Sequence, residues 1–252
     1  MKNKTIVISG GCGLLGQEFA KTLKEEDYQI IVIDKNLKGK NLIPNIHYFN
    51  IDITNEILVK EYIKIIYDNY GLDILINCAA INPSQNIGDG IFNDFETYPL
   101  ELWNKTMNTN LTGVFLLNRE CIQHMLNNKN EGFKGTIINI TSDLGIIASD
   151  HRIYNSSYKK PVDYGVSKAG LIYLTKYIAG YYRDEIKSIC LTPGSVYTNQ
   201  SEELKENLEN RIPIKRLANK NEYNGAIKFL CSEDSDYMQG QSLIMDGGRT
   251  IW

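Results

Sequence analysis

The chain has 252 residues, of which 42% are hydrophobic and 23% are charged, values typical of a soluble globular protein. Its net charge of -3 leaves no basic surface for nucleic acid, and no apolar run is long enough to cross a bilayer. The five cysteines are scattered without a C-x-x-C pair, which disfavours a disulfide framework and a metal site. We therefore expect a soluble, cytoplasmic protein that works without nucleic acid, membrane or metal.

Short β-branched runs alternate with longer amphipathic stretches along the chain. We predict strands at Thr5–Ser9, Ile30–Asp34, Ile46–Asn50, Ile74–Asn77, Thr136–Thr141, Lys187–Thr192 and Ser242–Asp246. We predict helices at Leu14–Glu26, Glu56–Tyr70, Leu100–Asn127, Tyr164–Arg183, Glu202–Glu209 and Glu222–Cys231. Several strand candidates are continuously apolar, which indicates strands covered on both faces. The regular alternation predicts an α/β fold, a doubly wound parallel sheet with helices on both faces.

A glycine-rich segment, Ser9–Gly16, joins the first predicted strand to the first predicted helix and contains the pattern G-x-G-x-x-G. Such glycines permit a tight turn and let the backbone approach a pyrophosphate, which the helix N-terminus then faces. The pattern alone also fits a purely structural turn, but its position favours dinucleotide binding. The chain length and the lack of a linker rich in Pro, Gly or Ser predict a single Rossmann-type domain over residues 1–252. The residues expected to contact the dinucleotide here are Gly10, Gly13, Leu14, Leu15 and Gly16.

Asp34 ends the second predicted strand, where a carboxylate can bond the adenosine ribose hydroxyls. It would also repel the extra phosphate of NADP, by about 3 kcal/mol per unit charge at ~5 Å and an effective dielectric of ~20. The neighbouring Lys35 and Lys38 can soften this repulsion. We therefore predict NAD(H) as the cofactor, with a solvated strand-end carboxylate as the alternative reading of Asp34.

Tyr164 and Lys168 lie four residues apart at the start of a predicted helix, so both side chains leave one face. Of the 16 tyrosines, only Tyr164 has a lysine four positions later. An ammonium at ~4 Å stabilises a phenolate by roughly 4 kcal/mol, about three pKa units. Tyr164 is then a candidate general acid and base for hydride transfer to or from a carbonyl carbon. The pair alone also fits an ordinary helix-surface contact.

Over essentially its whole length the chain resembles the short-chain dehydrogenase/reductase family. The segments that carry the resemblance are the glycine turn, Asp52, Asn77–Ala80, Asn108–Leu111, Ser142, Tyr164–Lys168, Pro193–Thr198 and Gly240–Gly248. It implies that Tyr164 exchanges the proton, Ser142 polarises the substrate oxygen, and Lys168 holds the cofactor ribose and lowers the pKa of the tyrosine. It further implies that Asn110 anchors a water that relays protons. A structural amide at Asn110 and a turn residue at Ser142 are the alternatives.

The resemblance also implies the remaining cofactor contacts. Asp52 and Ile53 would contact the adenine, and Asn77 and Ala79 would support the wall of the cofactor site. The nicotinamide end would be bound by Pro193, Val196 and Thr198. Asn77 can equally stitch neighbouring strands together, and Pro193 with the following glycine is a turn signal in any chain. Members of the family form homodimers or homotetramers through their long helices, and we expect the same here.

Two departures from the family pattern matter. Leu14 replaces a glycine usual in members of this length, and the separation of Ser142 and Tyr164 is wider than usual. The segment Asp143–Asp163 must lie beside the substrate because catalytic residues flank it. It carries basic residues suited to an anionic group. We expect substrate contacts from Asp143, Arg152, Lys159 and Lys160, a solvated loop being the alternative.

This segment is also similar to oxidoreductases of the flagellin modification protein A-like group, which accompany surface-sugar biosynthesis. We therefore expect an NAD(H)-dependent alcohol/ketone oxidoreductase acting on a small molecule, a sugar or sugar derivative of surface-glycan biosynthesis. Two alternatives stay open at this point. One is a nucleotide-sugar epimerase or dehydratase that retains its NAD, and the other is a non-catalytic NAD(H)-sensing binding protein.

Overall fold

The computed structural model describes residues 4–82, 94–129, 132–154 and 159–251. In this part of the chain seven strands form one sheet, paired in parallel throughout, in the order β3-β2-β1-β4-β5-β6-β7. The strands are β1 (Thr5–Ser9), β2 (Gln29–Asp34), β3 (His47–Asn50), β4 (Ile74–Asn77), β5 (Gly135–Ile140), β6 (Ile186–Pro193) and β7 (Ser242–Met245). Each predicted strand is present within one residue at either end, and the predicted Rossmann fold is confirmed.

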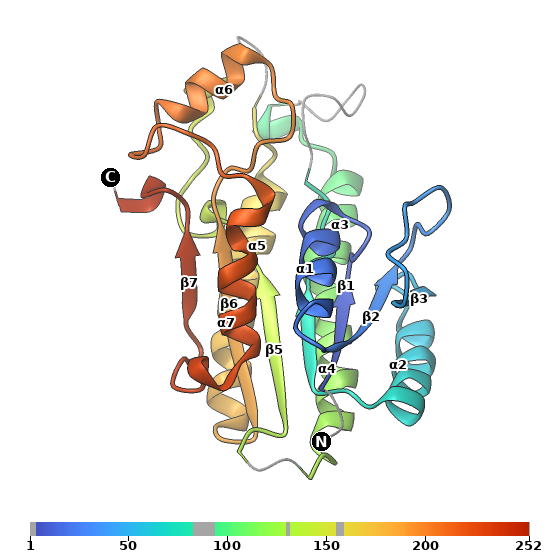
Figure 1. Cartoon of the computed structure of the whole chain (residues 1–252). Helices are drawn as coiled ribbons and strands as arrows, with labels where there is room; N and C mark the ends of the chain where they lie inside the picture. The colour runs from blue at the N-terminus through green and yellow to red at the C-terminus, as the bar shows by residue number, and fades with distance from the viewer. Residues whose placement is uncertain (1–3, 83–93, 130–131, 155–158, 252) are drawn as a thin grey trace.

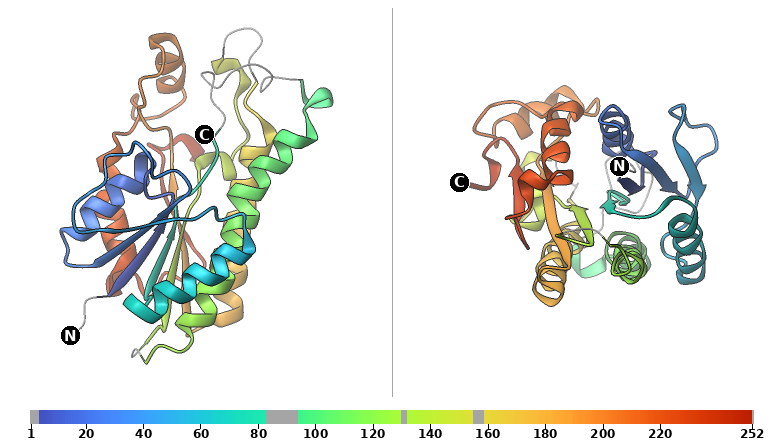
Figure 2. Two further views of the ribbon diagram at one scale, coloured as in Figure 1. Left: turned by 90° about the vertical axis from the view of Figure 1, so that its right-hand side faces the viewer. Right: turned by 60° about the horizontal axis from the view of Figure 1, so that its bottom comes forward.

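Helices cover both faces of the sheet. The α-helices of the described residues are α1 (Leu14–Lys24), α2 (Glu56–Tyr70), α3 (Leu100–Met107), α4 (Gly113–Met125), α5 (Val162–Tyr182), α6 (Glu202–Glu209) and α7 (Asn224–Cys231), of which α6 lies beyond the carboxyl ends of the strands (Figure 1). Figure 1 shows α1 and α7 in front of the strands, and the turned views of Figure 2 show α2, α4 and α5 on the opposite side. In the described residues, no helix combines the length and apolarity that a membrane span needs.

The alternating side chains of each strand build two apolar cores. From β1, Ile6 and Ile8 pack on the side of α1 and α7, where Phe19 is fully buried. Val7 between them points to the opposite core, which Leu117 of α4 helps to fill. This two-sided burial explains why the strand sequences are continuously apolar.

The long helix predicted over Leu100–Asn127 is interrupted. A single π-helical turn, Asn108–Thr112, separates α3 from α4, and the N–H of Gly113 bonds the carbonyl of Asn108. Such turns insert one extra residue and are frequent at functional sites. A smaller difference precedes α7, where Lys220–Tyr223 form a 3-10 turn instead of the first turn of the predicted helix.

The strand order places a crevice at the carboxyl ends of the central strands. The chain proceeds from β1 outward through β2 and β3, and then returns to the other side of β1 as β4. Ser9 at the end of β1 therefore lies between Ile33 of β2 and Asn77 of β4. In doubly wound sheets, ligands bind at such a switch point.

Candidate active site

The glycine turn brings the N-terminus of α1 close to the ends of β1 and β4. Gly10 has φ +65, and a Cβ there would lie 2.5 Å from the Cα of Ala79. A Cβ on Gly16 would collide with the carbonyl oxygen of Gly10, so the helix can approach the turn only because this residue has no side chain. Gly13 is the N-cap of α1 and its N–H bonds the Gly10 carbonyl at 2.9 Å. This compact cradle fits the pyrophosphate of a dinucleotide.

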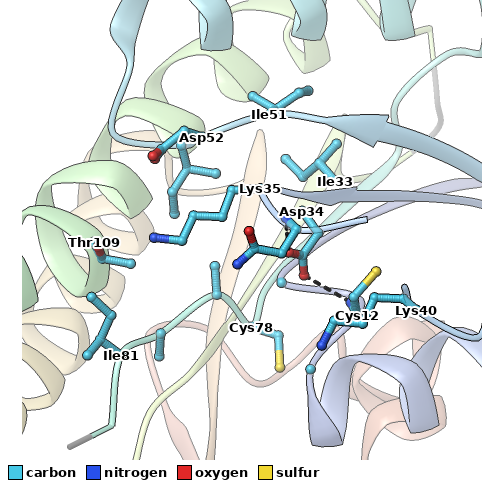
Figure 3. Close-up of a pocket in the computed structure, with 16 residues that line it drawn as sticks. Cys12, Ile33, Asp34, Lys35, Lys40, Ile51, Asp52, Cys78, Ile81 and Thr109 are labelled. Carbon is cyan, nitrogen blue, oxygen red and sulfur yellow. Dashed lines mark hydrogen bonds between the residues drawn. The ribbon is translucent and has the colours of Figure 1, made fainter. Parts of the chain in front are cut away.

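A first cavity, of about 240 Å³, opens beside this turn (Figure 3). Of the predicted cofactor residues it is lined by Gly10, Gly13, Asp34, Asp52, Ile53 and Ala79. Asp34 is held at the end of β2 by two main-chain groups: one carboxylate oxygen accepts from Cys12 N at 3.1 Å, the other from Asn36 N at 2.9 Å. The side chain thus ties the strand end to the glycine turn.

The charges in the first cavity are mixed. Hydrogen bonds from the main-chain N–H and the hydroxyl of Thr54 hold the pKa of Asp52 below its ordinary value, although burial opposes them. Lys35 and Lys40 also line the cavity, whereas Lys38 does not. Lys40 was not predicted to lie here; its positive charge acts to lower the pKa of the Cys12 thiol, which burial raises (Figure 3).

A second cavity, of about 410 Å³, adjoins the first through shared walls at Gly13, Cys78 and Ala80. It extends across the carboxyl ends of β5 and β6. The predicted residues that line it are Leu14, Leu15, Ser142, Asp143, Lys160, Tyr164, Lys168, Pro193, Val196 and Thr198. The two cavities together form one groove that could hold a dinucleotide in its first part and a substrate in its second.

Tyr164 stands at the start of α5 in this second cavity. Asp163 fixes the helix start because one of its carboxylate oxygens accepts from the N–H of Tyr164 at 2.7 Å and the other from the hydroxyl of Tyr98 at 2.8 Å. Burial raises the pKa of Tyr164 to about 12, and its hydrogen bond with Ser142 only partly opposes this. Burial therefore outweighs the lowering of this pKa by the neighbouring side chains.

Lys168 is buried beside Tyr164. Its ammonium donates to the carbonyl of Ile140 at 2.7 Å and lies 5.7 Å from the centre of the Tyr164 ring. Burial lowers the pKa of Lys168 to about 8. The lysine is therefore held in place by the end of β5, on the same side of the groove as the tyrosine.

Ser142 follows β5 and belongs to a buried chain of polar contacts. Its hydroxyl donates to Asp143 at 2.8 Å, and the second oxygen of that carboxylate accepts from Arg249 at 2.7 Å. Both charged side chains are almost fully buried, at 4% and 6% exposed. Arg249 was not predicted from the sequence, and it lines the same cavity as Tyr164.

Asn110 is fully buried in the π-helical turn. Its amide exchanges two hydrogen bonds with the main chain of Ile81, at 2.7 and 2.9 Å, and donates a third to the hydroxyl of Ser167 at 3.2 Å. Both amide hydrogens are thus used within the protein. A relayed water would have to be held by an oxygen of Asn110, either in its side chain or in its main chain.

The basic residues of the segment between Ser142 and Tyr164 separate into different places. Lys160 lines the second cavity, and its ammonium lies 4.9 Å from the centre of the Tyr164 ring. Lys159 is not in the wall of the second cavity and lines a neighbouring one. The side chain of Arg152 is 80% exposed, outside the cavity, and pairs with Asp150 through two nitrogens at 2.9 and 3.0 Å. The structure therefore gives no support to Arg152 as a substrate anchor. Residues 155–158 of this segment lie outside the described residues.

Two predicted cofactor residues stand behind the cavity walls. Gly16 lies beneath the turn, and Asn77 is buried, where its amide donates to Asn118 at 2.7 Å and to Asn139 at 2.9 Å. Asn77 thus links β4 to β5 and to α4 by hydrogen bonds. This is the structural role given above as the alternative to support of the cofactor site. Over the described residues, no group of three or more His, Cys, Asp or Glu side chains is placed to hold a metal ion.

A family model of reductases and a solved dehydrogenase structure match this chain over nearly its whole length. The family model described as enoyl-(acyl carrier protein) reductase matches residues 14–250. Among solved structures, a short chain dehydrogenase from Leptospira borgpetersenii with bound NAD+ is 32% identical, with a TM-score of 0.88. The match covers 99% of this chain and 94% of that one.

Curated relatives extend over the whole length of the chain. The 3-oxoacyl-(acyl-carrier-protein) reductase FabG of Thermotoga maritima is 26% identical, covering 100% of this chain and 99% of its own. Glucose 1-dehydrogenase 2 of Bacillus subtilis is 25% identical, covering 100% of this chain and 96% of its own. These relatives carry oxidoreductase names but differ in the substrate that each name gives.

Proposed function

Since this chain belongs to the short-chain dehydrogenase/reductase family, whose named members above are oxidoreductases, we propose that it interconverts a secondary alcohol and a ketone with NAD(H). The observation that carries the proposal is the placement of Ser142, Tyr164 and Lys168 around one cavity that continues into the glycine cradle. Groups that transfer a proton therefore lie where the reactive end of a dinucleotide would reach.

The chemistry is assigned to three side chains. When bound, the nicotinamide accepts a hydride from the alcohol carbon or donates one to the carbonyl carbon. In the oxidation direction the Tyr164 oxygen takes the hydroxyl proton, and in reduction the Tyr164 hydroxyl returns a proton to the carbonyl oxygen. The Ser142 hydroxyl rotates from Asp143 to donate to that same oxygen, and Lys168 holds the ribose and stabilises the phenolate by its charge.

NAD(H) is the proposed cofactor because Asp34 is held, by Cys12 and Asn36, at the mouth of the first cavity. A carboxylate fixed there can accept from two ribose hydroxyls, whereas a phosphate on the same ribose would bring like charges together. The NAD+ bound to the Leptospira borgpetersenii relative supports this choice.

Titration with NADH and NADPH, followed by cofactor fluorescence, tests the preference. We expect NADH to bind at least roughly ten-fold tighter, since a repulsion of about 1.4 kcal/mol already gives that ratio. Asp34→Ala should narrow the difference chiefly by strengthening NADPH binding. Equal affinities in the wild-type protein would contradict the assignment, and copurified NAD without turnover of added NADH would favour an epimerase or dehydratase instead.

For the substrate, we propose a small polar molecule, a sugar or a sugar derivative of surface-glycan synthesis. The relative named glucose 1-dehydrogenase 2 supports a sugar, and so does the lining of the second cavity, in which Ser149, Ser195 and Gln200 offer hydrogen bonds. A panel of keto-sugars and of neutral ketones with NADH tests this proposal. Faster reduction of the apolar ketones would contradict it.

A homodimer or homotetramer is also part of the proposal. One face of α5 carries three exposed tyrosines at four-residue spacing. They are Tyr173, Tyr177 and Tyr181, which are 71%, 58% and 66% exposed. Phe115 on α4 adds a further exposed aromatic side chain. An aromatic stripe of this kind is typical of a protein interface.

A further inference from the structure

A buried arginine that the proposed mechanism does not use completes the second cavity. Arg249 follows the Asp246–Gly248 turn after β7 and is only 6% exposed. One of its nitrogens, Nη1, donates to Asp143 at 2.7 Å and to the hydroxyl of Ser195 at 3.4 Å. A charge at this depth is costly to bury, so its position beside the reactive groups calls for a reason.

The other edge of the guanidinium is open. In the described part of the chain, Nε and Nη2 of Arg249 donate to no protein group, yet neither is among the buried polar atoms that lack a partner. Both atoms therefore keep some accessible surface, and Arg249 lines the second cavity. Nε and Nη2 form the fork that binds a carboxylate with two parallel hydrogen bonds.

Among the described residues of the cavity wall, both carboxylates already have cationic partners. Asp143 already accepts from Ser142, from the N–H of Leu144 and from Nη1 of Arg249 itself. The carboxylate of Asp150 is shared by Arg152 and Arg211, at 2.9 and 2.7 Å. The ammonium of Lys160 adds a further positive charge to the lining. The second cavity therefore favours an anion.

We propose that the Nε–Nη2 edge of Arg249 binds a carboxylate carried by the substrate near its reacting carbon, which makes the substrate a hydroxy acid or keto acid of sugar-like size. This inference rests on the proposed function. The position of the substrate carboxylate follows from two contacts. Arg249 donates to Asp143, and Asp143 accepts from Ser142, the serine that polarises the substrate oxygen. A group held by Arg249 therefore lies within a few bonds of that oxygen.

Aldonic and uronic acids of the common hexoses, each paired with its neutral amide, test the inference. With NAD+, the wild-type enzyme should oxidise the preferred acid with at least a ten-fold higher kcat/KM than its amide. Arg249→Gln should lower kcat/KM for the acid by roughly 10- to 100-fold more than for the amide, mostly through KM, so that the acid-over-amide ratio falls. Arg152→Gln removes the same charge outside the cavity and is the matched control, for which we expect the wild-type ratio.

Arg249→Lys separates binding from folding, because an ammonium can keep the ion pair with Asp143 but has no two-pronged edge. If the arginine only stabilises the fold, Arg249→Lys should recover the Tm that Arg249→Gln loses and keep the wild-type ratio of kcat/KM between acid and amide. If the arginine binds the substrate carboxylate, Arg249→Lys should recover the Tm, but its acid-over-amide ratio of kcat/KM should stay well below that of the wild type.

The remaining outcomes are distinguishable. Equal rates for acids and amides in the wild type, turnover of neutral sugars alone, or an unchanged ratio in Arg249→Gln would overturn the inference and leave the oxidoreductase assignment intact. Absence of NADH binding and of hydride transfer with every substrate would remove the proposed function and the inference with it.

Discussion

Tyr164 is buried, and burial raises its pKa to about 12. The tyrosine is thus protonated at neutral pH, as the donor in carbonyl reduction must be, but it is a weak acid until positive charge stabilises the phenolate. For alcohol oxidation the phenolate needs positive charge nearby. Lys168, Lys160 and the ring of an oxidised nicotinamide are groups that can provide it.

Tyr164→Phe keeps the aromatic ring and removes the hydroxyl. We expect kcat to fall by roughly 10²- to 10⁴-fold, the usual contribution of a positioned proton donor, while NADH binding stays close to that of the wild type. Steady-state kinetics and NADH titration provide the two measurements. Tyr177→Phe, on the exposed face of α5, is the control and should retain full activity. Substantial turnover by Tyr164→Phe would exclude the tyrosine as the proton donor.

The pKa of Lys168, lowered by burial to about 8, predicts a pH dependence of cofactor binding. Below pH 8 the ammonium is charged and can donate to the ribose, and above it an increasing fraction is neutral. The Kd for NADH should therefore be constant below about pH 8 and rise above it. Lys168→Arg stays protonated over the whole range, so any binding it retains should lack this rise. A wild-type Kd that is flat to pH 10 would contradict the prediction.

Arg152 and Arg249 show what the sequence alone could not predict about single residues. The tether between Ser142 and Tyr164 predicts that a basic residue lies near the substrate, and Lys160 does line the second cavity. The spacing does not say where each side chain points. Arg152 donates to Asp150, two residues earlier, and stays at the surface. Arg249 lies far along the chain from Ser142, and only the pairing of β6 with β7 brings it there.

At the scale of elements, the π-helical turn could not be read from the hydrophobic pattern. The apolar periodicity runs from Leu100 past Gly113 without a proline to announce a break. What fixes the turn is a distant contact: Asn110 must face the main chain of Ile81, with which it exchanges two hydrogen bonds. Sequence periodicity records which face is apolar, not the one extra residue that such a contact requires.

The glycine cradle gives an element-scale prediction with an internal control. Gly16→Ala places a methyl group against the Gly10 carbonyl, so α1 must move away from the turn. We expect loss of NADH affinity by more than roughly ten-fold and a destabilisation of about 1–3 kcal/mol, as for other overpacked sites.

Gly180→Ala on α5 meets nothing within 4 Å. Because alanine is the better helix former, this variant should gain about 0.5–1 kcal/mol and bind NADH normally. Denaturant unfolding and NADH titration of both variants make the comparison. Equal behaviour of the two would mean that the close approach at Gly16 is not needed.

At the scale of the whole molecule, the fold class was predictable because continuous apolar strands and regular alternation admit few arrangements. The order of the strands was not, since nothing in the local pattern says that β4 returns to the free side of β1. The assembly of copies is a further property at this scale, and the tyrosine stripe on α5 makes it testable.

Tyr177→Glu places a charge in the middle of that stripe. If α5 forms an interface, the variant should shift to smaller species in light scattering coupled to size-exclusion chromatography, while its circular dichroism stays that of the folded protein. Lys176→Glu, a neighbouring charge change on the same helix, serves as the comparison. A wild-type protein that is monomeric at all concentrations would contradict the expected oligomer.

The strand order also bears on how the molecule can be built during translation. After β1, every later strand is added at an edge that already exists: β2 and β3 on one side, then β4, β5, β6 and β7 in turn on the other. No strand has to insert between two that are already paired, so the nascent chain can extend its sheet as it leaves the ribosome.

The groove would be completed in the same direction. The walls of the first cavity come from residues between Gly10 and Thr109, Tyr164 and Lys168 follow with α5, and Arg249 arrives only after β7. We therefore expect ribosome-bound chains that have emerged through α4 to acquire nucleotide affinity first. Discrimination between acidic and neutral substrates should be the last property that the growing chain gains.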